Sequence, residues 1–237
     1  MRLDVMCASR LGSRTKAQDL IKEGKVKVNG TIQKKPSLSV EETDVIEIDD
    51  SNTYVSRGAY KLKGCLDTFD VSLDNEVVLD IGASTGGFTQ IALEYGAYKV
   101  YALDVGHLQL DPILEKDCRV IKMEGMNARE IDCSWFEDSI HFFCMDVSFI
   151  SAKTILIPVL ETLKVQHCAF LIKPQFECGP KYLNHKGILK NKKIEKNIVD
   201  DYRRFMLQYF KNVQIMPSVI KGRNGNQEFM LYANERR

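Results

Sequence analysis

Four charged residues stand where an apolar framework would have to hold them close together. Asp146 follows the apolar run FFCM and Lys173 follows AFLI, so each closes an expected buried strand. Lys61 stands in SRGAYKL, near the start of an expected helix, and Glu228 opens the last expected strand after a Gly-Asn turn. A buried charge is costly unless it is paired. The four residues therefore either form two salt bridges that hold strand ends, or they carry out a reaction.

A loop of small residues follows another apolar strand, in LDIGASTGGFTQ at 79–90. Such a loop lets a ligand lie against bare backbone, and a dinucleotide, a nucleoside triphosphate and S-adenosylmethionine all bind in such places. The dinucleotide pattern G-x-G-x-x-G would place glycine at position 84, which is Ser84 here. A P-loop needs Gly-Lys-Ser/Thr, and no lysine occurs between 64 and 98. The residues of this loop therefore favour S-adenosylmethionine, a ligand that carries no phosphate.

Acidic residues fall where this cofactor would need them. Asp80 is expected near the ammonium group of the cofactor, and Asp104 ends the next strand, where its carboxylate would accept both ribose hydroxyls. Glu124 or Asn127, after the third strand, is expected to meet the adenine amine. The predicted cofactor-binding residues are Asp80, Gly82, Ala83, Ser84, Gly86, Gly87, Phe88, Asp104, Glu124 and Asn127.

The second part of the chain, 57–237, alternates strands with helices after an expected linker at 51–56. Such alternation predicts an α/β fold with a mostly parallel, doubly wound sheet, whose ligands bind at the carboxyl ends of the strands. Strands are expected in EVVLDIG, KVYALDVG, RVIKMEG, HFFCMDVSF, CAFLIKP, VQIMPS and EFMLYAN, with a helix at 197–210 in NIVDDYRRFMLQYF.

The first 50 residues predict a separate small α+β module. Residues 2–10 and 13–24 read as two helices, the second capped by Ser13. KVKVNGTIQKKP then predicts two strands joined by an Asn-Gly turn, and TDVIEID predicts a last strand. The apolar side expected for the first helix is Leu3, Val5 and Met6.

Basic residues gather on this module, around the helix pair and the hairpin entry. The stretch SRTKAQDLIKEGKVKVNG resembles the S4 domain, a fold that binds RNA. The resemblance implies contact with RNA through its shape and phosphates more than through base edges. The residues expected to make this contact are Arg10, Arg14, Lys16, Lys25 and Lys27.

The net charge is only +1, but the charge is unevenly distributed. Residues 1–35 carry nine Lys or Arg and three Asp or Glu, and residues 181–237 carry thirteen and five. Residues 51–180 hold eleven bases and eighteen acids. Two basic ends around an acidic middle favour a polyanionic partner that is held from two sides. Solvated faces without a partner are the simpler alternative.

Taken in order, the motifs VSRGAYKL, LDIGASTGGFT, VYALDVG, MDVSFIS, LIKPQFE and GNQEF resemble the TlyA family, which is haemolysin-A-like. The resemblance implies an S4 domain joined to an FtsJ/RrmJ-like class I methyltransferase domain with a Rossmann-like, mostly parallel seven-stranded sheet. It implies 2′-O-methylation of a ribose in ribosomal RNA, with cytidine as the expected nucleoside. Shorter members act on large-subunit 23S rRNA and longer ones also on 16S rRNA, so 23S rRNA in the 50S subunit is favoured for this chain.

The family's catalytic Lys-Asp-Lys-Glu tetrad falls on Lys61, Asp146, Lys173 and Glu228. A ribose 2′-hydroxyl is a weak nucleophile until its proton is drawn off, and two ammonium groups held together repel, which favours proton loss from one. Lys173 is the expected base and Asp146 would orient it. Lys61 would hold the hydroxyl or a phosphate, and Glu228 would complete the charge balance.

Two further features lie next to these motifs. Phe149 and Phe176 could stack a splayed base, although core packing is the favoured prediction for both. The basic segment 180–196, PKYLNHKGILKNKKIEK, is expected to be a mobile lid or an RNA-contacting loop.

Composition narrows the class of protein. No apolar run reaches the roughly 18 residues of a membrane span, and the first residues lack the apolar core of a secretory signal. Seven cysteines form no CxxC pair, which predicts reduced core residues in the cytoplasm and no metal site. We expect no membrane and no DNA partner, and a monomer is favoured.

Three other functions are weighed against methylation of ribose. A membrane-lysing haemolysin is the least favoured, because no segment is apolar enough to insert. An S4-containing ribosome-assembly factor that binds the cofactor without methyl transfer is the main alternative, and the intact tetrad argues against it. Methylation of a base nitrogen usually requires Asn/Asp-Pro-Pro-aromatic, and DVSF lacks both prolines.

Overall fold

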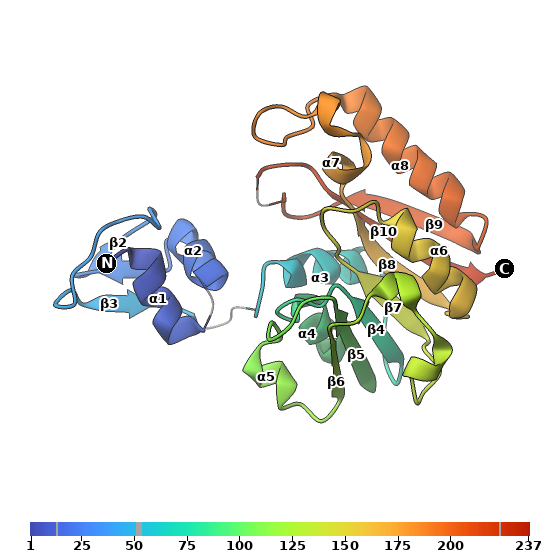
Figure 1. The fold of residues 1–237 in the computed structure, drawn as a ribbon, viewed down its shortest axis with the longest axis horizontal. Helices are drawn as coiled ribbons and strands as arrows, with labels where there is room; N and C mark the ends of the chain where they lie inside the picture. Colours follow the sequence, from blue (N-terminus) through green and yellow to red (C-terminus); the bar gives the residue numbers. More distant parts are fainter. Residues whose placement is uncertain (13, 51–53, 223) are drawn as a thin grey trace. The chain divides into compact units, whose positions relative to one another are not determined.

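The computed structural model describes residues 1–12, 14–50, 54–222 and 224–237, and it divides into two compact units, Met1–Ser56 and Arg57–Arg237 (Figure 1). The expected cap Ser13 lies outside the described residues, as do positions 51–53 of the expected linker.

Unit 1 packs two helices on a small antiparallel sheet. Its strands lie in the order β2-β1-β3, and β1 pairs with both neighbours. The predicted hairpin is confirmed: Asn29 and Gly30 both have positive φ, at 51° and 76°, which the tight turn between β1 and β2 requires. The elements are α1 (Leu3–Leu11), α2 (Arg14–Glu23), β1 (Val26–Val28), β2 (Thr31–Ile32) and β3 (Ile46–Ile48).

The buried side of α1 differs from the expected one. Leu3 and Cys7 are fully buried, whereas Val5 is 38% exposed, so its prediction as a core residue is wrong. Residues four apart lie on one face of a helix, and a residue two positions on points away from that face. Asp4 is also buried, and it accepts hydrogen bonds from Arg2, Arg14 and Gln18.

Unit 2 contains a seven-stranded sheet in the order β6-β5-β4-β7-β8-β10-β9. The first five strands of this order run parallel, and β10 is antiparallel to both β8 and β9. The predicted α/β fold with a mostly parallel sheet is confirmed. The strands are β4 (Val77–Ile81), β5 (Lys99–Asp104), β6 (Val120–Glu124), β7 (Phe142–Met145), β8 (His167–Ile172), β9 (Phe210–Pro217) and β10 (Phe229–Arg236).

Helices cover both faces of this sheet (Figure 1). Leu79 and Ile81 face a core that includes side chains of α6 and α8, while α3 and α4 pack on the opposite face. Alternate residues of β4 serve the two faces, since side chains alternate along a strand. The helices are α3 (Gly58–Phe69), α4 (Gly87–Glu94), α5 (Pro112–Glu115), α6 (Lys153–Thr162), α7 (Pro174–Glu177) and α8 (Lys192–Met206), with short 3₁₀ turns at Ala128–Glu130, Cys133–Trp135 and Pro180–Tyr182.

The helix expected at 197–210 is displaced toward the N-terminus. Helix α8 begins at Lys192, where Asn191 accepts hydrogen bonds from the backbone N–H groups of Lys193 and Ile194. It ends at Met206, and Phe210 already belongs to β9. The last five residues of the basic segment 180–196 are therefore helical, and the prediction of one continuous loop is wrong there.

The cysteines are all free, and four of them are buried: Cys7, Cys65, Cys144 and Cys168. Cys118 and Cys133 are exposed, so the core prediction is wrong for these two. None of the helices in the described part of the chain has the length and apolar character needed to span a bilayer.

Candidate active site

The four predicted charged residues form one chain of ion pairs at the carboxyl ends of the strands. Asp146 directly follows β7, Lys173 follows β8, Glu228 precedes β10, and Lys61 lies in the first turn of α3. Lys173 Nζ lies 2.5 Å from Asp146 Oδ1, and Lys61 Nζ lies 3.7 Å from Asp146 Oδ2. Lys61 Nζ also donates to Glu228 Oε2 at 2.7 Å. The fold thus brings together residues that are 167 positions apart in the sequence.

Two carboxylates and two ammonium groups balance one another in this cluster. The side chains of Lys61 and Lys173 are 10% exposed and that of Glu228 is 4% exposed. Burial by itself raises the pKa of Asp146, but the charges and hydrogen bonds of Lys61 and Lys173 outweigh burial, and the pKa lies below its usual value. Asp146 is therefore ionised and bridges the two lysines.

Sequence analysis missed two polar residues that orient this cluster. Lys173 Nζ donates to Ser148 Oγ at 2.7 Å, and Gln175 Nε2 donates to Glu228 Oε1 at 2.9 Å. Both lie two residues beyond a strand-end charge, in DVSF and KPQF, and this position is the signal that could have identified them.

The loop between β4 and α4 needs glycine at two positions for reasons of space and conformation. Gly82 has a φ of 79°, and a Cβ there would lie 2.9 Å from the backbone oxygen of Asp146. Gly86 has a φ of 91°, and a Cβ there would lie 2.2 Å from Leu114 Cδ1. L-residues rarely adopt such φ values, and Ser84 nevertheless has a φ of 49°. The loop therefore lies directly against the backbone of the ion-pair cluster.

Asp80 and Asp104 lie at the carboxyl ends of neighbouring strands but in different environments. Asp80 is fully buried, its Oδ2 accepts from Thr89 Oγ1 at 2.7 Å, and its Oδ1 has no hydrogen-bond partner among the described residues. Burial, together with nearby Asp146 and Asp104, raises the pKa of Asp80 to about 7. Asp104 is partly exposed and accepts backbone N–H groups from Ser84 and Gly106, at 2.8 and 2.7 Å.

Glu124 and Asn127 are both engaged by the protein itself. The Glu124 carboxylate accepts the backbone N–H groups of Leu108 and Gln109, at 2.8 and 3.0 Å, and these bonds lower its pKa. Asn127 Oδ1 accepts from the backbone N–H of Arg129 at 3.2 Å and so caps a 3₁₀ turn. The remaining predicted cofactor residues, Ala83, Gly87 and Phe88, are buried in the loop and at the start of α4.

These features fit S-adenosylmethionine. A glycine loop without room for side chains, an unpaired buried acceptor on Asp80 and the partly exposed carboxylate of Asp104 lie at the carboxyl edge of one parallel sheet. The cofactor carries ammonium, sulfonium and ribose hydroxyl groups, so the donor and charge pattern of the ligand matches the acceptors of the protein.

Two phenylalanines lie beside the ion-pair cluster. Phe149 is 90% exposed and has a φ of 66°, so the prediction that it packs in the core is wrong. Its ring centroid lies 5.1 Å from that of Phe176, which is half-buried after β8. An exposed aromatic residue in a left-handed conformation is unusual in a loop without function.

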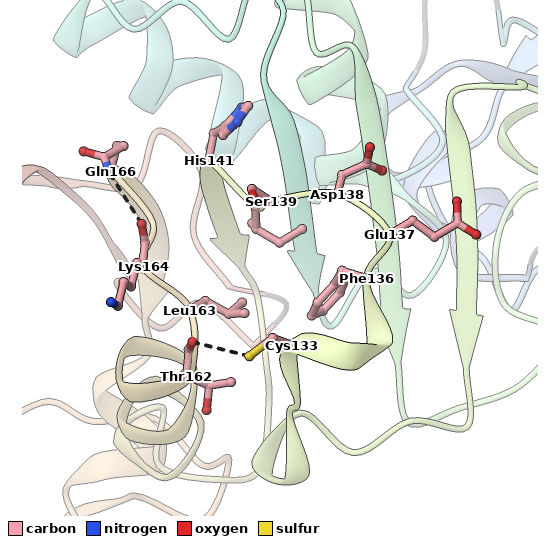
Figure 2. Close-up of a pocket in the computed structure, with 11 residues that line it drawn as sticks. Cys133, Phe136, Glu137, Asp138, Ser139, His141, Thr162, Leu163, Lys164 and Gln166 are labelled. Carbon is pink, nitrogen blue, oxygen red and sulfur yellow. Dashed lines mark hydrogen bonds between the residues drawn. The ribbon is translucent and has the colours of Figure 1, made fainter.

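A pocket of about 440 Å³ lies at the opposite end of the sheet, where β7 and β8 begin (Figure 2). His141 directly precedes β7 and Gln166 directly precedes β8, and both line the pocket. Asp138, one of the carboxylates that line the pocket, accepts hydrogen bonds from Lys99 Nζ and Tyr101 Oη, at 2.5 and 2.7 Å. The pocket contains no predicted site residue, and the length of the strands separates it from the ion-pair cluster.

The basic residues predicted to contact RNA all lie in unit 1, but several have structural contacts. Arg14 Nε pairs with the buried Asp4 at 3.1 Å, and Arg10 donates to the backbone oxygen of Ile46 at 2.9 Å. Lys16 lies on α2. The other two form loose surface pairs, Lys25 with Glu23 at 3.5 Å and Lys27 with Glu47 at 3.8 Å.

The strand order and the glycine loop define the class as a Rossmann-like methyltransferase fold, preceded by a small α+β unit. Comparison with family models agrees, since residues 1–46 match the S4 domain and residues 54–235 match the FtsJ-like methyltransferase domain.

Curated relatives extend over nearly the whole chain. Hemolysin A of Brachyspira hyodysenteriae is 40% identical over 98% of this chain and 99% of its own. The 23S rRNA (cytidine-2′-O)-methyltransferase TlyA of Campylobacter jejuni is 35% identical over 98% of both chains. A solved structure of a hemolysin-named protein from Streptococcus thermophilus matches with a TM-score of 0.78 at 33% identity, covering 99% of this chain and 88% of the other. The chain belongs to the TlyA family of S4-containing, FtsJ-like methyltransferases, as its motifs predicted.

Proposed function

We propose that the protein transfers a methyl group from S-adenosylmethionine to the 2′-hydroxyl of a cytidine in 23S rRNA. The observation that carries the proposal is the ion-pair chain of Lys61, Asp146, Lys173 and Glu228, which lies against the Gly82 loop. The printed activity of the Campylobacter jejuni relative supports cytidine and the large subunit. The substrate is expected to be the 50S subunit in the cytoplasm, with 16S rRNA as a possible second substrate.

In this proposal S-adenosylmethionine supplies an electrophilic methyl group, and the residues of the loop and of the neighbouring strand ends hold the cofactor. Gly82, Ser84 and Gly86 present backbone, Asp104 receives the ribose hydroxyls, and Asp80 faces the ammonium end. Glu124 and Asn127 shape the adenine side through the turns that they hold.

Lys173 in its neutral form takes the proton of the 2′-hydroxyl. Asp146 and Ser148 hold its amine in place for this step. Bound S-adenosylmethionine would supply the methyl carbon to this hydroxyl oxygen, with its sulfur as the leaving group that keeps the electron pair. Asp146 orients Lys173 and stabilises the ammonium that forms. Lys61, held by Glu228, binds the hydroxyl or an adjacent phosphate.

Phe149 is proposed to stack on the target base when the nucleotide is turned out of its helix. Its exposure and its contact with Phe176 support this role, because base-aromatic stacking needs a ring face that is open to solvent.

The test is transfer of labelled methyl groups to 50S and 30S subunits from a strain without this methylation. Nucleoside analysis should identify 2′-O-methylcytidine in 23S rRNA, and the modified nucleotide should resist alkaline cleavage because its 2′-oxygen is blocked. Lys173→Ala should lower the rate by roughly 10²–10⁴-fold with unchanged cofactor affinity. Lys164→Ala, at the opposite end of β8, is the matched control.

Cofactor and subunit binding without methyl transfer by the unmodified protein would contradict the proposal and favour the ribosome-assembly factor. Leakage of liposomes caused by the pure protein would instead revive the haemolysin alternative. Methyl label on a base nitrogen would show that the tetrad serves a different acceptor.

A further inference from the structure

A buried asparagine joins two loops beside the catalytic carboxylate. The Asn226 side chain is only 5% exposed, its Oδ1 accepts from the backbone N–H of Leu189 at 3.0 Å, and its Nδ2 donates to the backbone oxygen of Gly187 at 2.9 Å. A buried amide with both ends satisfied fixes its partners firmly. Residues 183–190 are therefore held in place and do not form a free lid.

The segment 183–190 has a compact structure of its own. Asn184 Oδ1 accepts from the backbone N–H groups of Lys186 and Ile188, both at 2.9 Å, and Leu183 and Leu189 form an antiparallel bridge. The Leu189 side chain is buried, whereas Lys186 is exposed at the tip of the turn. The turn thus presents its charge to solvent from a rigid base.

The two stretches of chain that meet at Asn226 carry basic residues and no acidic ones. Residues 179–190 and 218–226 contain no Asp or Glu. Four lysines on these two stretches are exposed, and we call them the lysine rim: Lys181, Lys186, Lys190 and Lys221. Within the described parts of the chain, no carboxylate lies at ion-pair distance from any of them, so their charge is available to a partner.

The flanking acids do not neutralise this surface because they are engaged inward. Glu177 accepts from Tyr202 Oη and Ser151 Oγ, at 2.6 and 2.8 Å. Glu228 is held by Lys61 and Gln175.

The same loop also supports the catalytic cluster. Gly222 donates its backbone N–H to the backbone oxygen of Asn226 at 3.0 Å, and a Cβ on Gly222 would lie 2.5 Å from Glu228 Oε1. Asn226 thus connects the base of the lysine turn to the loop that backs Glu228.

We propose that the lysine rim binds phosphates of the RNA that flanks the target ribose, and that Asn226 sets the position of this surface relative to Glu228. The inference rests on the proposed function, because RNA is the polyanion that such a site would receive. Four exposed cations on the stretches that precede α8 and Glu228 would position the RNA backbone, and the tetrad would then act on the hydroxyl.

The test measures equilibrium binding of the full chain to 50S subunits as a function of salt concentration. Lys186→Gln with Lys190→Gln should reduce the salt slope of log affinity by about 1.4–1.8, since each lost phosphate contact removes roughly 0.7–0.9. The control is Lys164→Gln with Lys211→Gln, two exposed lysines near the amino ends of β8 and β9, of which Lys211 pairs with Glu235 at 3.5 Å. Equal slopes for the two pairs would overturn the inference.

Asn226→Ala tests the positioning role. If Asn226 positions the lysines, Asn226→Ala alone should already lower the salt slope of log affinity. Adding Lys186→Gln and Lys190→Gln to Asn226→Ala should then lower it little further, whereas independent effects would add. Additive effects would refute the positioning role. If Asn226→Ala does not fold, the two lysine pairs decide the proposal alone.

Measuring both binding and methyl transfer distinguishes a failure of this inference from a failure of the proposed function. A reduced slope without any methyl transfer by the unmodified protein would support the surface and contradict the methyltransferase activity. Methyl transfer with equal slopes for the two lysine pairs would support the activity and reject the surface.

Discussion

Asp146 is the residue on which the electrostatics of the site depend. It lies between two lysines, and its pKa is lowered because their attraction exceeds the cost of burial. Replacing Asp146 with Asn would leave Lys61 paired with Glu228 but Lys173 without a carboxylate partner, so the position of the Lys173 amine would change. The types of these residues could be predicted from sequence. Ser148 and Gln175 could have been noticed from their positions, two residues beyond Asp146 and Lys173, but their hydrogen-bond partners could not be predicted, because a hydrogen bond depends on which loops meet.

Asp80 predicts a pH dependence of cofactor binding. Its pKa of about 7 means that the carboxyl is partly protonated near neutral pH, and a cationic ligand beside it would favour the ionised form. Affinity for S-adenosylmethionine should therefore rise with pH, by at most about tenfold per pH unit below 7, and level off above it.

Calorimetry in buffers of different ionisation enthalpy should detect proton release on binding below pH 7. The variant Asp80→Asn should release fewer protons and show a flatter pH profile. If this substitution leaves the pH profile of binding unchanged, the titrating group belongs to the ligand and not to Asp80.

At the scale of elements, the alternation of strands and helices was predictable, while their ends and some partners were not. The start of α8 was missed because 192–196 is rich in lysine, yet Asn191 is a helix-capping residue and was the available signal. The sequence pattern did not predict that β10 lies between β8 and β9, because strand order depends on packing between distant parts of the chain.

The loop after β4 gives a prediction about stability. Gly82→Ala would impose a φ of 79° on an L-residue and bring a Cβ to 2.9 Å from the Asp146 backbone oxygen. We expect a loss of about 1–3 kcal/mol from backbone strain, with the close contact adding to it. Chemical denaturation monitored by circular dichroism measures the change.

Gly187→Ala is the control for this substitution. Its φ of 71° is similar, but no atom lies within 4 Å of the added Cβ. The Gly82 variant should be clearly less stable than the Gly187 variant, and equal stabilities would show that the contact with Asp146 is unimportant.

For the whole molecule, the uneven distribution of charge was the clearest feature of the sequence. Each unit contributes basic residues of its own, Lys25 and Lys27 in unit 1 and the lysine rim in unit 2. Some predicted RNA contacts also stabilise the fold, as Arg14 does with Asp4, and sequence alone could not separate these roles.

Two basic surfaces on one polyanion should act together. Lys25→Gln with Lys27→Gln should reduce the salt slope of 50S binding by about as much as the pair Lys186→Gln and Lys190→Gln, and all four together by about the sum. Filter binding between 50 and 200 mM salt provides the measurement. If the four-fold variant behaves like either pair alone, the two surfaces do not bind the same RNA.

The place of β10 within its sheet has a consequence for the time at which the enzyme becomes active. Ribosomes synthesise chains from the N-terminus, so β9 emerges before the strand that must separate it from β8. Glu228 and β10 are translated after Lys61, Asp146 and Lys173. A nascent chain can therefore complete its S4 unit early, but it gains the full ion-pair cluster only after Glu228 and β10 have been translated.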